Sequence, residues 1–273
     1  HFIKKGKRML SNIFLKSLWD FRKAAVYWII SIFLLALYIV FVISTIELDA
    51  FQTIIDSFPK ALTQFIAGES GIDFGSIEGF LNAQIFTIMA PIFAIAVAVN
   101  SGGKSTANEE SSKSLDIILS APITRESFLI QKVFSMVIKT FFIATVHWLS
   151  YYILCKMFSQ DISAEGLFAI CLNLFLMGIS FGVIAVYVGT LNGSSTNSIG
   201  IAGGLALISY LIANIAPLVD SLDITKYFSL FYYYKSGDPL KLGVHNWHWI
   251  PFTTTFVLFF LLSILQFKKR NLL

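Results

Sequence analysis

The sequence predicts an all-α, polytopic membrane protein, and three observations support this fold class. Of the 273 residues, 56% are hydrophobic and only 13% are charged, with a mean hydropathy of +0.75. A soluble globular domain carries about 25% charged residues. The apolar residues gather in six runs of the length that a helix needs to cross a bilayer. These runs lack the alternation of a β-barrel, so only helices can satisfy the backbone in lipid.

A basic, aromatic-rich leader precedes the first run. Its residues 9–23 read MLSNIFLKSLWDFRK, with polar Lys16, Asp20 and Lys23 mostly opposite an apolar face. The residues that share this apolar face at helical spacing are Leu10, Ile13, Phe14, Leu18 and Phe21. The pattern predicts an amphipathic helix lying in the membrane interface, in preference to a simple basic anchor.

Six transmembrane helices follow within one membrane domain that covers residues 1–273. The expected spans are residues 24–46, 80–99, 128–154, 167–191, 198–219 and 250–267. The connections include two long outer loops, 47–79 and 220–249, and one inner loop, 100–127.

Lysine and arginine predict the orientation, because they accumulate on the cytoplasmic side. With a cytoplasmic N-terminus, the inner segments hold thirteen of these residues and the outer segments hold five. The five outer residues are Lys60, Lys156, Lys226, Lys235 and Lys241. We therefore expect a multi-pass cell-membrane protein with both termini in the cytoplasm.

Residues Gly103-Lys104-Ser105 are similar to the end of a phosphate-binding loop, G-x-x-x-x-G-K-[ST]. However, Ala98 stands where the first glycine is needed, and the segment follows a membrane span rather than a strand. No Ser–His–Asp arrangement or HExxH motif is present in the sequence. We expect that this chain is not an enzyme and holds no cofactor, and that Cys155 and Cys171 are free apolar-helix residues.

Two histidines, His245 and His248, lie three residues apart before the last span. A metal site is conceivable there. Trp247 and Trp249 in the same segment favour an aromatic anchor at the outer interface instead, and we expect no metal.

The third span carries Lys132, Ser135, Lys139 and His147 on one broad side. Ionisable residues at membrane depth usually face protein or water and often mark function. Lys132 can reach the cytoplasmic surface, whereas His147 cannot easily do so. We expect Lys139 and His147 either to line a pathway or to hydrogen-bond neighbouring helices.

Small residues four positions apart occur in the fourth and fifth spans. They are Gly178 with Gly182, and Gly200 with Gly204. Such pairs let helix backbones approach closely, here within the chain or across a dimer. Pro217, close after Asn214, is expected to break the fifth helix near its outer end.

The most polar segment between two spans reads EESSKSLDIILSAPITRESFLIQK, from Glu109 to Lys132. Its acidic pair, short apolar helix, S-A-P-I-T-R turn and following basic residue resemble the first cytoplasmic loop of ABC-2 type exporter permeases. Lys113-Ser114 stands where Gly-Thr is usual in that family. The segment Gly237-Asp238-Pro239-Leu240 and the final span are similar too, with Asn271 where Asp is common.

The resemblance implies a single six-helix permease core in a bacterial membrane, surrounded by lipid. Two such cores, identical or homologous, would form a dimer with two copies of a separate ABC ATPase subunit that binds ATP and Mg. Nucleic acid is not an expected partner. A cytoplasmic coupling helix between spans two and three would dock on the ATPase. The residues that the resemblance assigns to docking are Glu109, Glu110, Leu115, Ile118, Leu119, Pro122 and Arg125.

The chemistry of these residues suits a docking helix. The leucines and Ile118 form a small apolar face for a groove. Pro122 ends the helix and Thr124 can cap the next one. The long first outer loop, 27 phenylalanines and few buried charges suggest an amphipathic or hydrophobic cargo, such as a peptide, lipid or drug.

The alternative function is a secondary transporter or channel without an ATPase partner. That class favours internal repeats and broken helices with coupling charges near the middle of the membrane. The sequence shows no convincing repeat, and a membrane-embedded enzyme is disfavoured because catalytic groups are missing.

Overall fold

The computed structural model describes residues 13–59, 62, 73–106, 124–244 and 247–269, and these residues form helices without a strand. Five helices are long and apolar enough to cross a membrane, and a pair of shorter helices bent by 41° makes a sixth candidate if the pair is counted as one span. The five single-helix candidates are α2 (Ile13–Thr45), α9 (Arg125–Met157), α10 (Ala164–Asn192), α11 (Ser195–Ile215) and α14 (Trp249–Lys269), and the bent pair is α5 with η2 followed by α6 (Ile77–Gly103). The predicted all-helical membrane fold is confirmed at this level.

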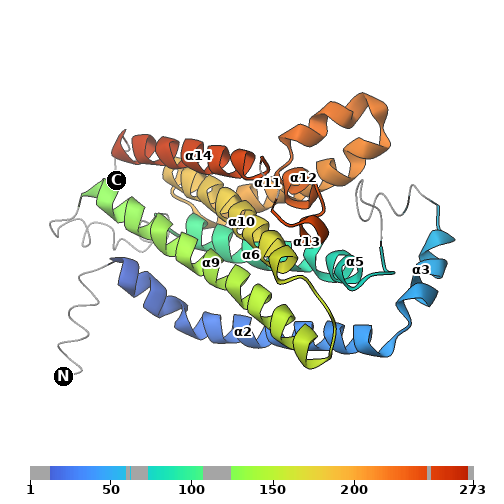
Figure 1. The fold of residues 1–273 in the computed structure, drawn as a ribbon. Helices are drawn as coiled ribbons and strands as arrows, with labels where there is room; N and C mark the ends of the chain where they lie inside the picture. The colour runs from blue at the N-terminus through green and yellow to red at the C-terminus, as the bar shows by residue number, and fades with distance from the viewer. Residues whose placement is uncertain (1–12, 60–61, 63–72, 107–123, 245–246, 270–273) are drawn as a thin grey trace, which may run out of the picture.

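The described chain begins and ends at one end of the bundle, and short connecting helices lie at the other (Figure 1). Helix α2 begins, α9 begins and α14 ends at the same end, which we call the terminal end. Short helices gather at the opposite end, which we call the distal end. These are α3 (Leu48–Asp56), α5 (Ile77–Leu81), α12 (Leu230–Lys235) and α13 (Pro239–Leu242).

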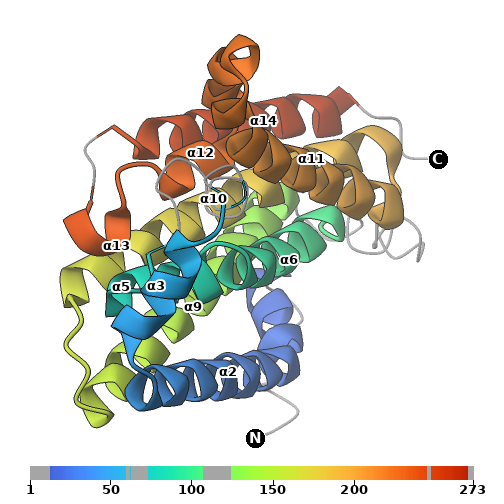
Figure 2. The ribbon, with the colours of Figure 1, turned by 90° about the vertical axis from the view of Figure 1, so that its right-hand side faces the viewer.

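Helix α10 forms the centre of the bundle, between α6, α9, α11 and α14 (Figure 2). In its most apolar stretch 78% of the residues are buried, against 17–39% in the other four long helices. A helix that is apolar all round is suited to this central position. The few polar side chains of α10 find partners: Ser180, for example, donates a hydrogen bond to the Phe252 carbonyl of α14 at 3.1 Å.

Hydroxyl side chains fix where the helices start. Thr124, Ser163, Ser194 and Ser229 are the N-caps of α9, α10, α11 and α12, and each accepts a hydrogen bond from the backbone N–H three residues later. Gly193 ends α10 with φ 65°, a left-handed conformation that favours glycine. The predicted spans 128–154 and 167–191 fall inside the capped helices α9 and α10, and the predicted span 250–267 falls inside α14.

The predicted interfacial helix and first span are one continuous helix from Ile13 onward. No glycine or proline lies between Ile13 and Thr45 to interrupt it. Its first turns pack lengthwise on α9, with Phe14 beside Phe134 and Phe21 beside Phe142. Helices of 33 residues span about 50 Å, so α2 and α9 are both longer than a bilayer core of about 30 Å. The location of these turns in the membrane interface stays a prediction.

The second span is broken, unlike the single helix 80–99 that the sequence predicts. Helix α5 runs into a π-helix, η2 (Asn82–Phe86), and α6 (Met89–Gly103) follows at a bend of 41°. At the bend the Tyr234 hydroxyl of α12 donates to the Phe86 carbonyl at 2.8 Å. A distant side chain thus satisfies a backbone group at the interruption.

The fifth span ends where the sequence predicts, at Pro217. Helix α11 stops at Ile215 and gives way to the 3₁₀ turn η3 (Ala216–Leu218), which contains the proline. A second 3₁₀ helix, η4 (Asp220–Phe228), leads to α12.

Candidate functional site

At the terminal end, the start of α9 is well fixed. The Thr124 hydroxyl accepts a hydrogen bond from the Ser127 amide at 3.2 Å, so the predicted cap is confirmed. Arg125 is the first residue of α9. The other predicted docking residues, Glu109, Glu110, Leu115, Ile118, Leu119 and Pro122, lie outside the described residues.

Side chains from four helices join at this end. Lys268 Nζ of α14 lies 2.8 Å from Glu126 Oε1 of α9, and Phe128 stacks on Phe267 at 6.2 Å between ring centroids. A buried apolar cluster completes the junction with Ile13, Leu129, Val133, Met136 and Val186. A displacement of the start of α9 would therefore act on α2, α10 and α14 together.

The segment Gly102-Gly103-Lys104 closes α6 rather than opening a helix. Carbonyl groups, not N–H groups, point past such an end, whereas a phosphate loop needs the N–H groups of a helix start. The glycines serve packing instead, because a Cβ on Gly102 would lie 2.2 Å from the Gly182 carbonyl oxygen.

Lys139 bonds to a neighbouring helix. Its ammonium donates to Ser17 Oγ of α2 at 2.9 Å, and Ser17 Oγ lies 2.6 Å from Ser135 Oγ. The Phe21 ring lies 5.6 Å from the same ammonium. Lys139 is buried, so this chain of hydrogen bonds replaces water around a charged group.

His147 lies deep in the bundle. Its Nδ1 is 2.9 Å from the Ile143 carbonyl, and its ring packs between Phe93 of α6 and Tyr151 of α9. Its Nε2 is buried with no hydrogen-bond partner among the described residues. Lys139 therefore faces α2 and His147 faces α6, so the structure does not bring these two side chains into one site.

The two glycine pairs have different surroundings. A Cβ on Gly178 would lie 2.7 Å from Thr140 Cγ2, and one on Gly182 would lie 2.6 Å from Met136 Sδ, so α10 and α9 approach closely here. Gly200 and Gly204 on α11 have nothing within 4 Å of the same position. The first pair packs inside the chain, and contact of the second pair across a dimer stays a prediction.

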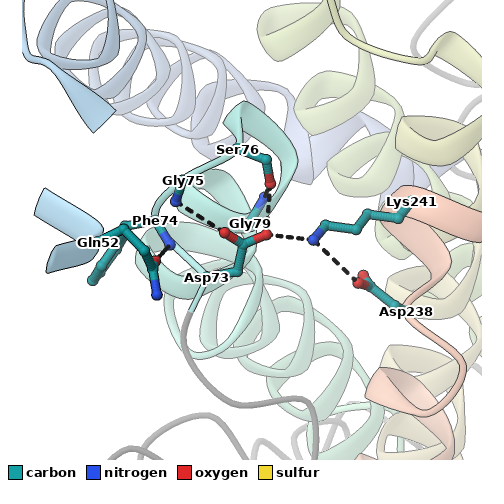
Figure 3. Close-up of polar contacts among 8 residues, drawn as sticks. All are labelled: Gln52, Asp73, Phe74, Gly75, Ser76, Gly79, Asp238 and Lys241. Atoms are coloured by element: carbon teal, nitrogen blue, oxygen red, sulfur yellow. Dashed lines mark hydrogen bonds and ion pairs between the residues drawn. The ribbon is translucent and has the colours of Figure 1, made fainter. Parts of the chain in front are cut away.

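At the distal end, Asp73 collects donors from two regions of the chain (Figure 3). Its carboxylate accepts hydrogen bonds from the Gly75 amide at 2.9 Å, the Ser76 hydroxyl at 2.7 Å and the Lys241 ammonium. Lys241 comes from α13 and also lies 4.0 Å from Asp238 Oδ2. Residues 168 positions apart are joined in this way, a pairing that spacing in the sequence does not reveal.

The charges of this pair are stabilised by contact. Burial pushes the pKa of Asp73 upward, but the hydrogen bonds from Lys241 and Ser76 outweigh it and leave that pKa below its ordinary value. The hydrogen bond to Asp73 raises the pKa of Lys241. Both groups are therefore charged at neutral pH.

The α12–α13 segment is held against the bundle by close contacts. Asn173 of α10 donates to the Tyr234 carbonyl at 3.4 Å. A Cβ on Gly166 would lie 1.9 Å from the Leu240 carbonyl oxygen, so only glycine lets α13 sit on α10. Together with the hydrogen bond from the Tyr234 hydroxyl to the Phe86 carbonyl, these contacts hold α12 and α13 against α10 and the bend of the second span.

Cys155 and Cys171 are free and buried, as expected. His245 lies outside the described residues. Among the residues that the structure does describe, no group of three or more His, Cys, Asp or Glu side chains is arranged to hold a metal ion.

A comparison with protein families agrees with this architecture. A profile described as "ABC-2 family transporter protein" matches residues 11–242, from the first turns of α2 through α13. A search of curated proteins found no match.

Proposed function

Because the chain belongs to the ABC-2 transporter family, a family of multi-pass membrane transport proteins, we propose that it is the permease subunit of an ATP-driven exporter. In this proposal a separate ATPase subunit binds ATP and Mg, two copies of it serve a pair of permeases, and the segment from Glu109 to Arg125 docks on it.

The junction at the terminal end is the observation that best supports this proposal. The segment predicted to dock connects α6 to α9, and the start of α9 is capped by Thr124 and tied to α14 through Glu126 and Lys268. A displacement of the docking segment would therefore move the first turn of α9 together with α14, because this turn is capped and paired rather than frayed.

The end of α6 offers a second route for the same force. Gly102 packs directly on the backbone of Gly182, so α6 cannot slide without moving the central helix α10. Rigid, closely packed elements transmit displacement, since packed interiors have low compressibility. Motion of α6 and α9 relative to each other would reach the bend at η2 and, beyond it, the distal end.

The proposed cargo is an amphipathic or hydrophobic molecule such as a peptide, lipid or drug. The long helices expose large apolar side chains and few charges, which suits a cargo drawn from the bilayer. Export as the direction of transport follows from the resemblance to exporter permeases.

The proposal is tested by the double substitution Leu115→Asp with Leu119→Asp. Two charges on the predicted apolar face should prevent docking, because a buried unpaired carboxylate is costly. We expect loss of co-purification with the ATPase subunit and loss of cargo-stimulated ATP hydrolysis. The matched control is Leu242→Asp, which makes the same change at an exposed residue of the distal end. Intact co-purification and stimulated hydrolysis in the double variant would refute the docking role.

A secondary transporter or channel is the second candidate, and the broken second span is the feature that favours it. Interrupted helices near the membrane centre are common in that class. Isolation of the chain from its native membrane without any ATPase subunit, together with ATP-independent transport in vesicles, would favour this candidate.

A further inference from the structure

Among the described residues, Lys235 differs from the other lysines at the distal end because no described carboxylate pairs with it. Lys241 pairs with Asp73, Lys226 lies 2.8 Å from Asp223, and Lys156 lies 3.6 Å from Asp161. Around Lys235 Nζ, the described residues place one polar atom, Asn214 Oδ1 at 3.3 Å, and the Tyr210 ring at 5.5 Å.

The surroundings of Lys235 disfavour its charge. The side chain is partly buried, and this burial lowers the pKa of Lys235 to about 8. Buried lysines are normally paired with a carboxylate, so a partly buried lysine with no carboxylate beside it among the described residues is a candidate functional site. A neutral amide and an aromatic face solvate the ammonium only in part.

The amide that faces Lys235 is held in a fixed orientation. Asn214 is buried, and its Nδ2 donates to the Tyr210 carbonyl at 2.8 Å, which leaves Oδ1 directed at the ammonium. Asn214 lies on α11 just before the helix ends at Ile215, ahead of the turn that contains Pro217, and Lys235 is the last residue of α12. The three residues thus form a small site between α11 and α12, built by a break in the fifth span.

We propose that Lys235, Asn214 and Tyr210 form a binding site for the anionic head group, a carboxylate or phosphate, of an amphiphile. An ammonium that has no counter-ion among the described residues can supply a charge-assisted hydrogen bond to such a group. The Tyr210 ring offers an apolar surface beside it for the first carbons of the chain. A cationic head group would be repelled by Lys235, so the site distinguishes amphiphiles by charge.

The identification of this amphiphile as the exported cargo rests on the proposed function, whereas binding of the anion does not. Binding can be measured on the full-length chain alone, in nanodiscs of phosphatidylcholine. A failure to bind would overturn the site and leave the permease proposal intact. A chain that binds the anion but does not associate with an ATPase subunit would overturn the permease proposal and leave the anion site intact.

The experiment compares dodecanoate and dodecyl phosphate with the uncharged dodecyl maltoside by titration calorimetry. We expect the anionic probes to bind and Lys235→Met to weaken them about tenfold, the effect of losing one charge-assisted hydrogen bond. Lys235→Arg should retain binding because it keeps the charge. Lys156→Met, which removes an exposed charge at the same end, should leave binding unchanged and so controls for the surface potential.

Asn214→Asp separates ligand binding from a purely structural role. It places a carboxylate 3.3 Å from Lys235, so the ammonium gains an internal partner and the anionic probes should be excluded. A lysine that only stabilises the ends of α11 and α12 would tolerate this change, and its probe binding would not alter. Wild-type binding of dodecanoate by both Lys235→Met and Asn214→Asp overturns the proposal.

A final comparison distinguishes the source of the anion. Nanodiscs that contain phosphatidylglycerol should lower the apparent affinity for dodecanoate in the wild type if a resident lipid fills the site. Unchanged affinity in those discs assigns the site to a single-chain amphiphile. With either result, the anion site is supported if Lys235→Met weakens the binding of dodecanoate.

Discussion

At the scale of single residues, the distal end depends on a carboxylate that satisfies several donors at once. Asp73 orders the turn before α5 through Gly75 and Ser76 and binds α13 through Lys241 (Figure 3). Gly79 leaves the room for this arrangement, since a Cβ there would lie 2.3 Å from the Asp73 carbonyl oxygen. A local turn and a long-range contact therefore share one side chain.

We expect Asp73→Asn and Lys241→Met to be coupled. Each should lower the melting temperature, and a double-mutant cycle should give a coupling free energy of about 0.5–1 kcal/mol, because both side chains are partly exposed. The control cycle uses Lys156 and Asp161, a more exposed pair at 3.6 Å, for which we expect a smaller coupling. Additive effects of Asp73→Asn and Lys241→Met would show that the interaction between the two side chains contributes nothing to stability.

The pH dependence of this pair follows from the direction of each pKa shift. The lowered pKa of Asp73 adds stability that is present above its ordinary value of 3.8 and is lost as the pH falls through the lowered pKa. The raised pKa of Lys241 adds stability that is present below its ordinary value of 10.5 and is lost as the pH rises further. The coupling should therefore be constant between about pH 5 and 9, which thermal melts across this range can check.

At the scale of helices, glycines decide which faces can approach. We expect Gly102→Ala to destabilise the chain by about 1–3 kcal/mol, because the new methyl group would meet the Gly182 backbone rather than a flexible side chain. Gly203→Ala is the control: its methyl group meets no described atom within 4 Å, and alanine favours a helix by about 1 kcal/mol over glycine. Melting curves of the two purified variants test this contrast, and equal stabilities would contradict the packing of α6 on α10.

The helices also show what the sequence could and could not predict. Spans with uninterrupted apolar runs and hydroxyl caps, such as the one that Thr124 begins, were predictable from local chemistry. The break after Phe86 was missed, and the partner that satisfies its backbone, Tyr234, lies 148 residues away and could not be found from spacing. Asn82 and Gln84 within the apolar run, with Pro91 soon after, were the local signals of an interruption.

The candidate sites divide in the same way. The docking residues were found by the pattern of a contiguous segment. Lys235 and Lys241 entered the sequence analysis only in the count of basic residues, and Asp73 only as part of the predicted outer loop 47–79. Their significance depends on partners from other helices, and spacing along the chain carries no information about those partners.

At the scale of the whole molecule, orientation is the central prediction. We expect Lys113→Cys to react with a membrane-impermeant thiol reagent only in inverted vesicles or permeabilised cells, and Lys156→Cys to react in intact cells. The native cysteines are buried and should contribute little background. Reaction of Lys113→Cys in intact cells would reverse the orientation inferred from the distribution of lysine and arginine.

The contact between Lys139 and Ser17 also bears on how the protein is made. Synthesis proceeds from the N-terminus, so α2 has already left the ribosome when Lys139 emerges 122 residues after Ser17. A lysine that enters lipid without a polar partner is costly, by about 2.5–3.5 kcal/mol at the membrane centre and by less where the side chain can reach the interface. Ser17 offers this ammonium a hydrogen-bond partner on arrival, which lowers the barrier to insertion of α9. We therefore expect the order of synthesis to favour assembly, because the first helix is in place before the charged segment of the third span enters the membrane.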